Sequence, residues 1–260
     1  MTPYLARIEI FPIKALDGVS VSQATVLASG ALQGDRAYAL FDADHHFING
    51  KRNALIHRLR TTFTDDGQSV CCTGDGHPPT PYFSLTDDRP ALEAWLGEYF
   101  QQRVSLQENR DLGFPDDTSS PGPTIVSTAT LQTVAAWYPG LTVEDVRRRF
   151  RTNLEIDGVP AFWEDQLFSH DSQPVRFAIG EVELEGINPC QRCVVPTRDA
   201  LTGAATPDFQ KTFATQRAAT LPEWTHPARF NHFYRLAVNT KILAQGGCVL
   251  RVGDAVQRLS

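Results

Sequence analysis

The sequence contains no long hydrophobic run, no excess of basic residues and no cysteine-rich segment. No apolar stretch approaches the roughly 20 residues that a membrane-spanning helix needs, and residues 1–7 lack the charged start and apolar core of a signal peptide. The net charge of −6 argues against a general surface for nucleic-acid polymers. We therefore expect neither a membrane nor a nucleic acid as a partner.

Disulfide bonds are also unexpected, because the five cysteines form an odd set and Cys71 and Cys72 are neighbours. Such a chain is typical of the reducing cytoplasm, where free thiols remain available as ligands. With 260 residues, of which 42% are hydrophobic and 21% charged, the chain can form one large or two medium domains with a sizeable core.

Short segments of alternating apolar and polar residues dominate the chain, which predicts a mainly β fold with some helices, in the α+β class. Apolar residues at helical spacing predict helices over residues 91–100, from about 130, and over 207–217. Asn49-Gly50 is a hairpin signal, and the acidic, proline-rich segment 116–123 is the best candidate for a domain junction. Strands are predicted over residues 6–11, 19–26, 37–41, 70–73, 124–128, 150–156, 176–179, 182–187, 233–238 and 248–254.

The segment 188–199 combines Cys190 and Cys193 with two arginines and two prolines. A thiolate is a soft metal ligand and a nucleophile, and neighbouring guanidinium groups favour its charged form. The preceding strand is predicted to end at Pro189, so both cysteines are expected in a loop at a strand end, where catalytic residues are common. From the spacing alone, half of a zinc site and a pair of small core residues remain open alternatives.

Eight short motifs follow one another along the chain. They are Ile10-Phe11-Pro12-Ile13-Lys14, Gly34-Asp35-Arg36, Phe150-Arg151-Thr152-Asn153, Glu164-Asp165, Ile179-Gly180, Pro189-Cys190-Gln191-Arg192-Cys193, Thr202-Gly203 and Val252-Gly253-Asp254. In this order they resemble the MOSC family, which is named after the C-terminal domain of molybdenum cofactor sulfurase. The chain is most similar to the long members with an N-terminal MOSC β-barrel domain, among them amidoxime-reducing and N-hydroxylaminopurine-detoxifying proteins. The resemblance implies an N-terminal β-barrel-like domain over residues 1–115 and a β-barrel MOSC domain over residues 116–260.

The resemblance also implies a bound molybdenum cofactor, in which molybdopterin holds the metal. Cys193 matches the family's metal ligand and would be catalytic, and Asp165 is the candidate for proton transfer. Helix capping or the orientation of neighbouring groups are alternatives for Glu164 and Asp165. Electrons would come from a separate ferredoxin-, flavodoxin- or cytochrome-type protein, because no ferredoxin-type cysteine cluster follows residue 193.

Basic and polar residues at matching positions are the candidates for holding the cofactor, since a buried phosphate needs charge-assisted donors. Two hydroxyl residues at the start of a predicted helix could add further donors. Plain alternatives are solvent exposure for Lys14, a surface ion pair for Arg36, a turn for Asn153 and a structural role for Cys190, while residues 147–149 are expected to be solvated surface. The cofactor candidates are Lys14, Arg36, Ser127, Thr128, Arg151, Asn153 and Arg192.

Two segments depart from the family pattern. The cysteine motif continues as Val195-Pro196-Thr197-Arg198-Asp199, where relatives often have Thr-Thr-Val-Asp-Pro. Arg198 adds positive charge near the expected metal, which favours an anionic substrate over a neutral hydroxylamine. The segment 168–174 is longer than usual and is expected at the rim of the pocket.

The leading hypothesis is a molybdenum-dependent oxidoreductase that reduces small N-hydroxylated compounds, namely amidoximes, hydroxylamines or N-hydroxylated bases. One alternative is a sulfur carrier or cofactor-handling protein with a persulfide on Cys193. Another is a zinc-binding module that adds ligands such as Cys248 to Cys190 and Cys193. Cytoplasmic location, a role in detoxification and pyridoxal phosphate binding are further expectations from the resemblance.

Overall fold

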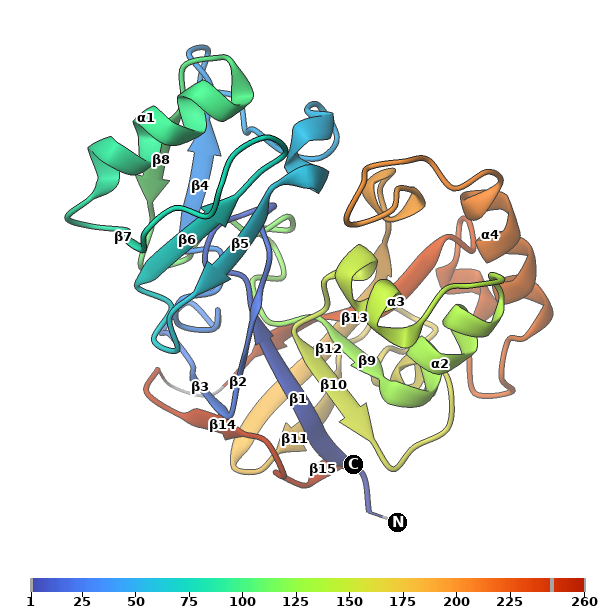
Figure 1. Ribbon diagram of the computed structural model, residues 1–260. Coiled ribbons are helices and arrows are strands. Elements are labelled where there is room, and N and C mark those ends of the chain that lie inside the picture. Colours follow the sequence, from blue (N-terminus) through green and yellow to red (C-terminus); the bar gives the residue numbers. More distant parts are fainter. Residues whose placement is uncertain (1, 244–245, 260) are drawn as a thin grey trace.

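The computed structural model describes residues 2–243 and 246–259 and shows a strand-rich molecule with a few helices (Figure 1). The predicted mainly β fold is confirmed. The strands are β1 (Tyr4–Ile10), β2 (Val19–Val21), β3 (Gln23–Thr25), β4 (Tyr38–Phe41), β5 (Arg60–Phe63), β6 (Ser69–Thr73), β7 (Phe83–Ser84), β8 (Ser105–Glu108), β9 (Ile125–Ser127), β10 (Leu154–Asp157), β11 (Val175–Ile179), β12 (Val182–Gln191), β13 (Arg235–Ile242), β14 (Val249–Arg251) and β15 (Val256–Arg258). The α-helices are α1 (Arg89–Phe100), α2 (Thr128–Ala136), α3 (Val143–Phe150) and α4 (Phe209–Ala219), and the 3-10 helices are η1 (Ala54–Arg58), η2 (Trp163–Leu167), η3 (Val195–Thr197) and η4 (Pro227–Arg229).

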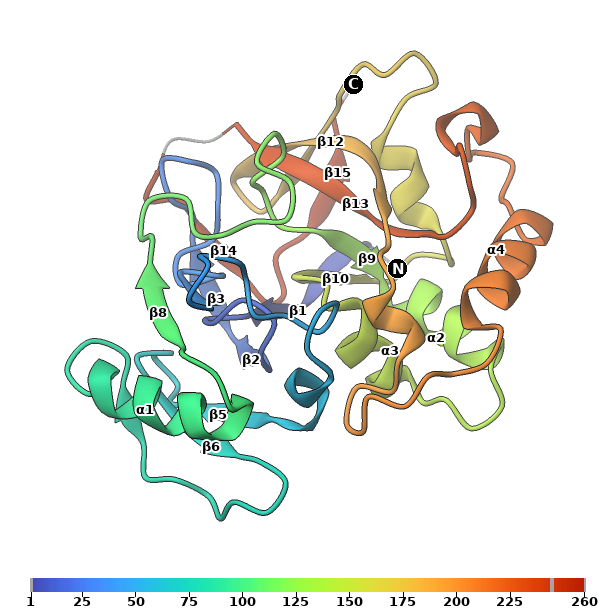
Figure 2. The ribbon, with the colours of Figure 1, turned by 90° about the horizontal axis from the view of Figure 1, so that it is seen from above.

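The largest sheet has the strand order β15-β11-β12-β13-β9-β10-β1-β2, and only β9 and β10 run parallel within its described pairs. Tyr4 forms a β-bridge with Ala255, and the Leu5 amide donates to the Asp254 carbonyl at 2.8 Å. These contacts bring β1 to the start of β15, so the sheet closes into a barrel (Figures 1 and 2). Closure gives most strand edges a partner.

The barrel core is built from both ends of the chain. Leu5 and Ile8 of β1 are fully buried with Ile125, Leu184 and Val238, because a register shift between Leu5 and Arg7 brings both side chains to the core face. Val26 and Val256 belong to the same core. The order of the chain therefore does not decide which core a residue joins, and the division at residues 115 and 116 stays a prediction.

A second core lies in the first half of the chain, between α1 and two small sheets, β4-β8 and β5-β6-β7. The predicted stripe of α1 is confirmed, because Leu92, Leu96 and Tyr99 are buried. In β6, Cys72 is fully buried and Cys71 is half-buried, as opposite faces of a strand require.

Helices α2, α3 and α4 lie beside the barrel and share an aromatic core with Tyr138, Phe209 and Tyr234 (Figure 1). A capping box of Thr142 and Asp145 starts α3, and its C-cap residue, Arg151, has the left-handed φ of 52°. No helix in the described part of the chain has the length and hydrophobicity needed to span a bilayer.

Three expectations about local structure were wrong. The Asn49-Gly50 turn leads into η1 rather than a hairpin strand, because Asn53 caps that helix through the Leu55 amide. Residues 19–26 form two strands, because β2 pairs with β1 and β3 with β14. Strand β12 continues through Pro189, which register shifts on either side accommodate, so Cys190 lies in a strand and Cys193 follows it.

Candidate functional site

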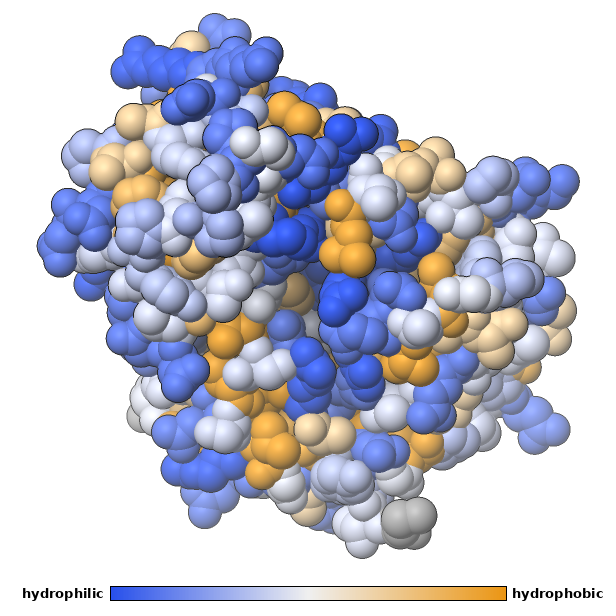
Figure 3. Space-filling model, in the orientation of Figure 1, coloured by the Kyte–Doolittle hydropathy of each residue, from blue (hydrophilic) through white to orange (hydrophobic). Residues whose placement is uncertain are grey.

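A large cavity of about 1140 Å³ lies between the barrel and the small sheets of the first half of the chain. Its wall combines residues of β1, η1, β5, α3 and the segment after β12. The space-filling view shows a hollow with a largely hydrophilic surface between the barrel and the small sheets of the first half of the chain (Figure 3). Segments far apart in the sequence therefore meet at one concave surface.

The cavity wall is strongly cationic although the chain is acidic. Twelve arginines and lysines line it against seven carboxylates, whereas the whole chain has a net charge of −6. A concave surface with this charge concentrates small anions, because low-dielectric walls focus the field. The arrangement favours a small anionic ligand over a polymer.

Cys193 is exposed and lines this cavity, as the sequence predicts. It follows the last residue of β12 by two positions, and the amide of the intervening Arg192 donates to the Tyr234 carbonyl at 3.2 Å. The barrel therefore fixes the start of this loop while the thiol stays accessible. An accessible thiol on a fixed base is a suitable metal ligand or nucleophile.

Arg192 is directed toward Cys190 rather than Cys193. One guanidinium nitrogen of Arg192 donates to the Cys190 sulfur at 3.1 Å, and the other donates to the Phe150 carbonyl. Cys190 is half-buried and also lines the cavity. The expectation that Arg192 holds the Cys193 thiolate therefore finds no contact in the described residues, and Arg192 joins the end of β12 to α3.

Arg36 and Arg151 converge on one aromatic ring of the cavity wall. Their guanidinium carbons lie 5.3 Å and 4.1 Å from the centre of the Phe11 ring. Both residues have a left-handed backbone, with φ of 50° and 52°. Such strain is typical of functional sites. Arg36 forms an ion pair with Asp35, whereas Arg151 has no acceptor among the described residues.

Burial, reinforced by the charge of Arg36, lowers the pKa of Arg151 to about 10. The guanidinium therefore remains protonated at neutral pH, although its charge is poorly solvated. The two cations repel each other, and the carboxylates that act on Arg151, namely Asp17, Asp35 and Asp116, do so without a direct hydrogen bond to it. This pair is the strongest feature of an anion site in the cavity.

Lys14 lies in the same wall and is not exposed to solvent. Its ammonium donates to the Phe114 carbonyl at 2.8 Å and to Asp116 at 2.6 Å, and it lies 5.2 Å from the centre of the Phe47 ring. Burial lowers the pKa of Lys14, while Asp116 opposes the shift. Because the Asp116 side chain is 80% exposed, that carboxylate can turn away when a ligand anion competes for Lys14.

Asn153 lines the cavity but its amide is already engaged by the protein. Its oxygen accepts from the Thr124 amide at 3.2 Å, and its nitrogen donates to the Glu9 carbonyl at 3.1 Å. These bonds tie β1 to the start of β9. Asn153 therefore shapes the wall on which Arg36 and Arg151 lie.

Ser127 and Thr128, which were predicted to hold the cofactor, do not line this cavity. Ser127 is fully buried and caps α2 through the Thr130 amide at 3.1 Å. The Thr128 hydroxyl donates to the Ile156 carbonyl at 3.4 Å and borders a separate, shallow depression. The prediction located the helix start correctly, but the Ser127 and Thr128 side chains point into the core and toward the adjacent depression rather than into the cavity.

Asp165 also lies outside the cavity, so the structure does not support its catalytic assignment. Its carboxylate accepts from Arg217 and, at 2.6 Å, from the Thr225 hydroxyl, and all three residues are buried. The neighbouring Glu164 accepts from the Thr130 hydroxyl at 3.1 Å. This group is a buried polar network that joins η2 to α2 and α4.

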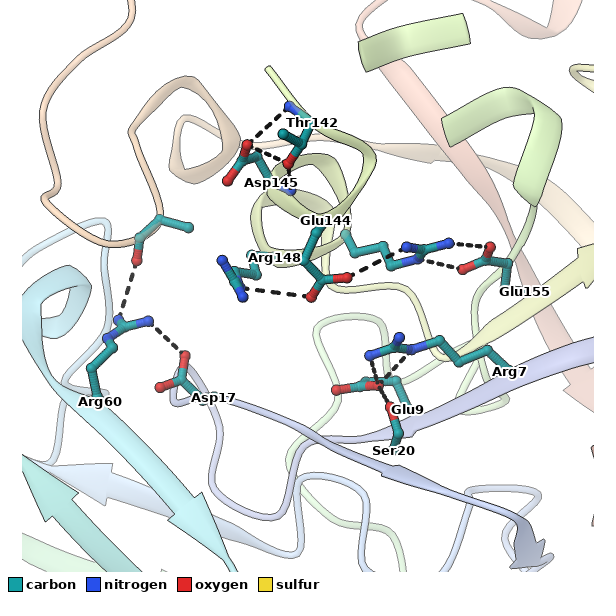
Figure 4. Close-up of polar contacts among 12 residues, drawn as sticks. Arg7, Glu9, Asp17, Ser20, Arg60, Thr142, Glu144, Asp145, Arg148 and Glu155 are labelled. Atoms are coloured by element: carbon teal, nitrogen blue, oxygen red, sulfur yellow. Dashed lines mark hydrogen bonds and ion pairs between the residues drawn. The ribbon is translucent and has the colours of Figure 1, made fainter. Parts of the chain in front are cut away.

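Residues 147–149 line the cavity, although the sequence suggested a solvated surface. Arg147 binds Glu155 through two contacts of 2.7 Å, and Glu144 bridges Arg147 and Arg148 (Figure 4). Figure 4 also shows Arg7 paired with Glu9 on the facing strand β1. Charged residues on a helix resemble a surface stripe in the sequence, and only the position of α3 places them in the wall.

Arg149 anchors the loop that carries Cys193. The side chain is 3% exposed and donates to the Thr206 hydroxyl at 2.9 Å and to the Pro196 carbonyl at 3.3 Å, with Asp199 at 3.6 Å. The loop is thus held to α3 at both ends of the segment 196–206. Arg149 is a positioning residue that sequence reasoning missed.

The first half of the chain contributes His57 and Arg60 to the same wall. Arg60 pairs with Asp17 at 2.9 Å (Figure 4) and donates to the Ala200 carbonyl at 3.2 Å. Gly203 comes so close to η1 that an added Cβ would lie 3.1 Å from that of His57. These contacts hold the cysteine loop against η1. No sequence signal connects residues that are about 140 positions apart.

Two other expectations are not met in the described residues. The segment 168–174 closes on itself through a bridge between Phe168 and Pro174 and does not line the cavity. The possible metal-ligand cluster among the described residues is Asp42, Asp44 and His46, which contains no cysteine. A zinc site that uses Cys190 and Cys193 therefore finds no further ligands there.

Comparisons with known proteins agree with these features. Residues 2–101 match the MOSC N-terminal beta barrel domain and residues 124–257 match the MOSC domain. The chain is 23% identical over 226 residues to a molybdenum cofactor sulfurase of Caenorhabditis elegans, covering 80% of this chain and 31% of the relative. It is 24% identical over 239 residues to mitochondrial amidoxime reducing component 2 of Bos taurus, covering 76% of this chain and 67% of the relative.

The chain thus spans about a third of the length of the sulfurase relatives it matches. Among solved structures, the YuaD protein of Bacillus subtilis aligns over 98% of this chain and 94% of its own, with a TM-score of 0.40 and 11% identity. The two domain matches together cover most of the chain, in the order that the sequence motifs indicate. This protein belongs to the MOSC family.

Proposed function

We propose that this protein binds a molybdenum cofactor in the cavity and reduces small N-hydroxylated compounds with electrons from a separate donor protein. The observation that carries the proposal is the convergence of the Cys193 thiol and the Arg36 and Arg151 pair on one cavity wall. The relative named for amidoxime reduction supports this reaction, and the relatives named for molybdenum cofactor sulfurase support only the cofactor.

The residues present fit such a group. Arg151 has no acceptor among the described residues and remains protonated, so it is available for a phosphate. Arg36 and Lys14 add two more donors beside it. Cys193 offers the soft ligand that a high-valent metal accepts. A volume of about 1140 Å³ leaves room for a substrate beside a cofactor.

When bound, the cofactor supplies the two-electron chemistry that converts an N-hydroxyl group, with two protons, into an N–H group and water. The residues of the protein would hold the cofactor in a fixed position. Cys193 would ligate the metal, and Lys14, Arg36 and Arg151 would hold the phosphate. Arg149 keeps the cysteine loop against α3, and Arg192 fixes the end of β12 from the side of Cys190. Precise positioning of this kind is the protein's main contribution.

Elemental analysis, combined with fluorescence of the oxidised pterin, tests the proposal on protein expressed in a host that makes the cofactor. We expect molybdenum and pterin together, and reduction of benzamidoxime with an artificial electron donor. Cys193→Ser should lower this activity more than about 100-fold, because even the residues that orient a metal ligand contribute 10- to 100-fold. Protein without molybdenum or pterin would contradict the proposal.

Cys190→Ser is the matched control for Cys193→Ser, because it removes a sulfur from the same cavity and the same segment. It should retain much of the activity, with a change that reflects only the lost contact to Arg192. Equal losses in both variants would show that the metal-ligand assignment is wrong.

A second candidate is a sulfur carrier or cofactor-handling protein. It is favoured by the exposure of Cys193 and by the similarity to molybdenum cofactor sulfurases. Mass spectrometry would then find one added sulfur atom on Cys193, and benzamidoxime would not be reduced. Turnover of benzamidoxime without a persulfide would exclude this candidate.

A further inference from the structure

Three cations of the cavity have no acceptor among the residues that the structure describes. Of the twelve basic residues in the wall, seven pair with carboxylates and two donate to the backbone or to Cys190. The three that remain are Lys51, Arg151 and Arg198. Arg151 belongs to the Phe11 end of the cavity, where the proposed cofactor phosphate would be held.

Arg198 belongs to a second region, around His57. It follows η3 in the cysteine loop and is half-buried, and its charge lowers the pKa of His57 after the larger effect of burial. Arg60 acts on His57 in the same direction but is already paired with Asp17. Lys51 acts on Lys14 and Asp116 and therefore belongs to the first region.

Asp199, which directly follows Arg198, and Asp17, which pairs with the neighbouring Arg60, are both already engaged. Asp199 accepts from the Leu201 and Thr202 amides at 3.1 and 2.8 Å and faces Arg149. Asp17 accepts from Arg60 and, at 2.8 Å, from the Thr61 amide (Figure 4). The side chain of Arg198 therefore has no carboxylate partner among the residues that the structure describes.

We propose that Arg198 binds an anionic group of the substrate, so that the preferred substrates are N-hydroxylated compounds that carry a carboxylate or a phosphate. The inference rests on the proposed reductase activity and specifies the class of its substrate. A planar guanidinium binds both groups through paired hydrogen bonds. Neutral amidoximes would be reduced by the same site without this contact.

A matched pair of substrates, benzamidoxime and 4-carboxybenzamidoxime, tests the inference on the cofactor-loaded enzyme. We expect Arg198→Ala to lower kcat/KM for the carboxylated compound roughly 10- to 100-fold, the effect of losing a charge-assisted hydrogen bond, and to leave benzamidoxime nearly unchanged. Arg198→Lys should retain part of the preference. Arg251→Ala, which removes an arginine of β14 outside the cavity, is the control and should change neither substrate.

A binding measurement separates this inference from the proposed function. Calorimetric titration with the two amidines that the reaction would yield, benzamidine and 4-amidinobenzoate, needs no turnover. We expect weaker binding of 4-amidinobenzoate alone in Arg198→Ala. If Arg198→Ala weakens the binding of 4-amidinobenzoate but wild type reduces neither amidoxime, the anion site is supported and the reductase proposal is wrong. If both amidoximes are reduced equally by wild type and Arg198→Ala, the anion site is wrong and the reductase stands.

Two further experiments identify the preferred anion and test whether Arg198 instead holds the cofactor. N6-hydroxyadenosine and its 5′-monophosphate replace the benzamidoximes, and a larger effect of Arg198→Ala on the nucleotide pair would identify phosphate as the preferred group. Molybdenum content is measured in every variant. A loss of molybdenum in Arg198→Ala, with equal loss of activity on all substrates, would overturn the inference, because Arg198 would then hold the cofactor.

Discussion

The cavity wall and the buried network behind η2 contain the same kinds of residues, but their charges are balanced in opposite ways. In the network, Arg217 is 2% exposed, pairs with Asp165 and lies 3.9 Å from the centre of the Phe162 ring. In the cavity, Arg151 lies over Phe11 with no acceptor among the described residues. The charge of Arg217 is compensated by a carboxylate of the protein, whereas the charge of Arg151 is available to a bound anion.

The difference teaches that burial of a charge does not identify a functional residue. A compensated buried pair such as Arg217 and Asp165 joins secondary-structure elements, here α4 and η2. An uncompensated charge on a concave wall lowers the stability of the empty protein and is explained only by a bound partner. Mutations should therefore change stability in the network and ligand binding in the cavity.

The largest expected effect is that of Arg217→Met. Removing the guanidinium leaves the buried Asp165 without its counterion, so the free energy of unfolding should fall by about 3–5 kcal/mol. Urea unfolding followed by circular dichroism measures the change. The control is Arg176→Met, which breaks the exposed pair with Glu183 and should cost less than about 1 kcal/mol.

Adding Asp165→Asn to Arg217→Met should restore part of the lost stability, because the buried charge is gone while Thr225 keeps an acceptor. A small loss in Arg217→Met, similar to that of the surface control, would show that the network is not a compensated buried pair.

An intermediate effect is expected from the pH dependence of Glu164. Burial, together with the neighbouring Asp165, raises the pKa of Glu164 from 4.5 to about 7 in the folded protein. The folded state therefore keeps a proton that the unfolded state releases, so stability should decrease as pH rises from about 4.5 to about 7 and then level off. The contribution of this group is about 1–3 kcal/mol.

Unfolding measurements between pH 5 and pH 8 on wild type and Glu164→Gln test this expectation. The stability of the variant relative to wild type should increase with pH across that range, since Gln carries no charge at any pH. Glu183→Gln, at an exposed position, should show no such trend. A constant difference between Glu164→Gln and wild type would rule out the shifted pKa.

The smallest effect on the free energy of unfolding is expected for Arg151→Gly. It should be an increase, whereas Arg217→Met should cause a decrease. Glycine adopts the left-handed φ of 52° at this helix end without strain, and the repulsion from Arg36 disappears. The free energy of unfolding of the cofactor-free protein should rise by up to about 1 kcal/mol. The molybdenum content should nevertheless fall, because the phosphate loses a donor.

Gln101→Gly is the matched control, since Gln101 ends α1 with φ of 53° and lies outside the cavity. It should gain similar stability and keep its molybdenum. If Arg151→Gly also keeps its cofactor, Arg151 is not a phosphate ligand.

The candidate residues that line the cavity and those that do not were chosen in partly different ways. Arg36, Arg151 and Cys193 match ordered motifs, and the structure brings them to one cavity. Ser127 was chosen from a local signal, a helix start, and Asp165 from the Glu164-Asp165 motif, and neither lines the cavity. A helix start or a short acidic motif does not determine which side of the barrel a side chain faces.

Cytoplasmic location, a role in detoxification, pyridoxal phosphate binding and the identity of the electron donor stay predictions from the sequence. The contacts of the cavity concern only small-molecule binding.

The sequence by itself determined the strand-rich class, the helices α1, α2 and α4, and the position of Cys193 just after a strand, because strand alternation, helical spacing and motifs act over a few neighbouring residues. Only the tertiary structure decided that α3 turns its arginines into the cavity, that η1 meets the cysteine loop, and that Asp165 is sealed against Arg217. These outcomes depend on contacts between residues 50 to 150 positions apart, which barrel closure and core packing establish together.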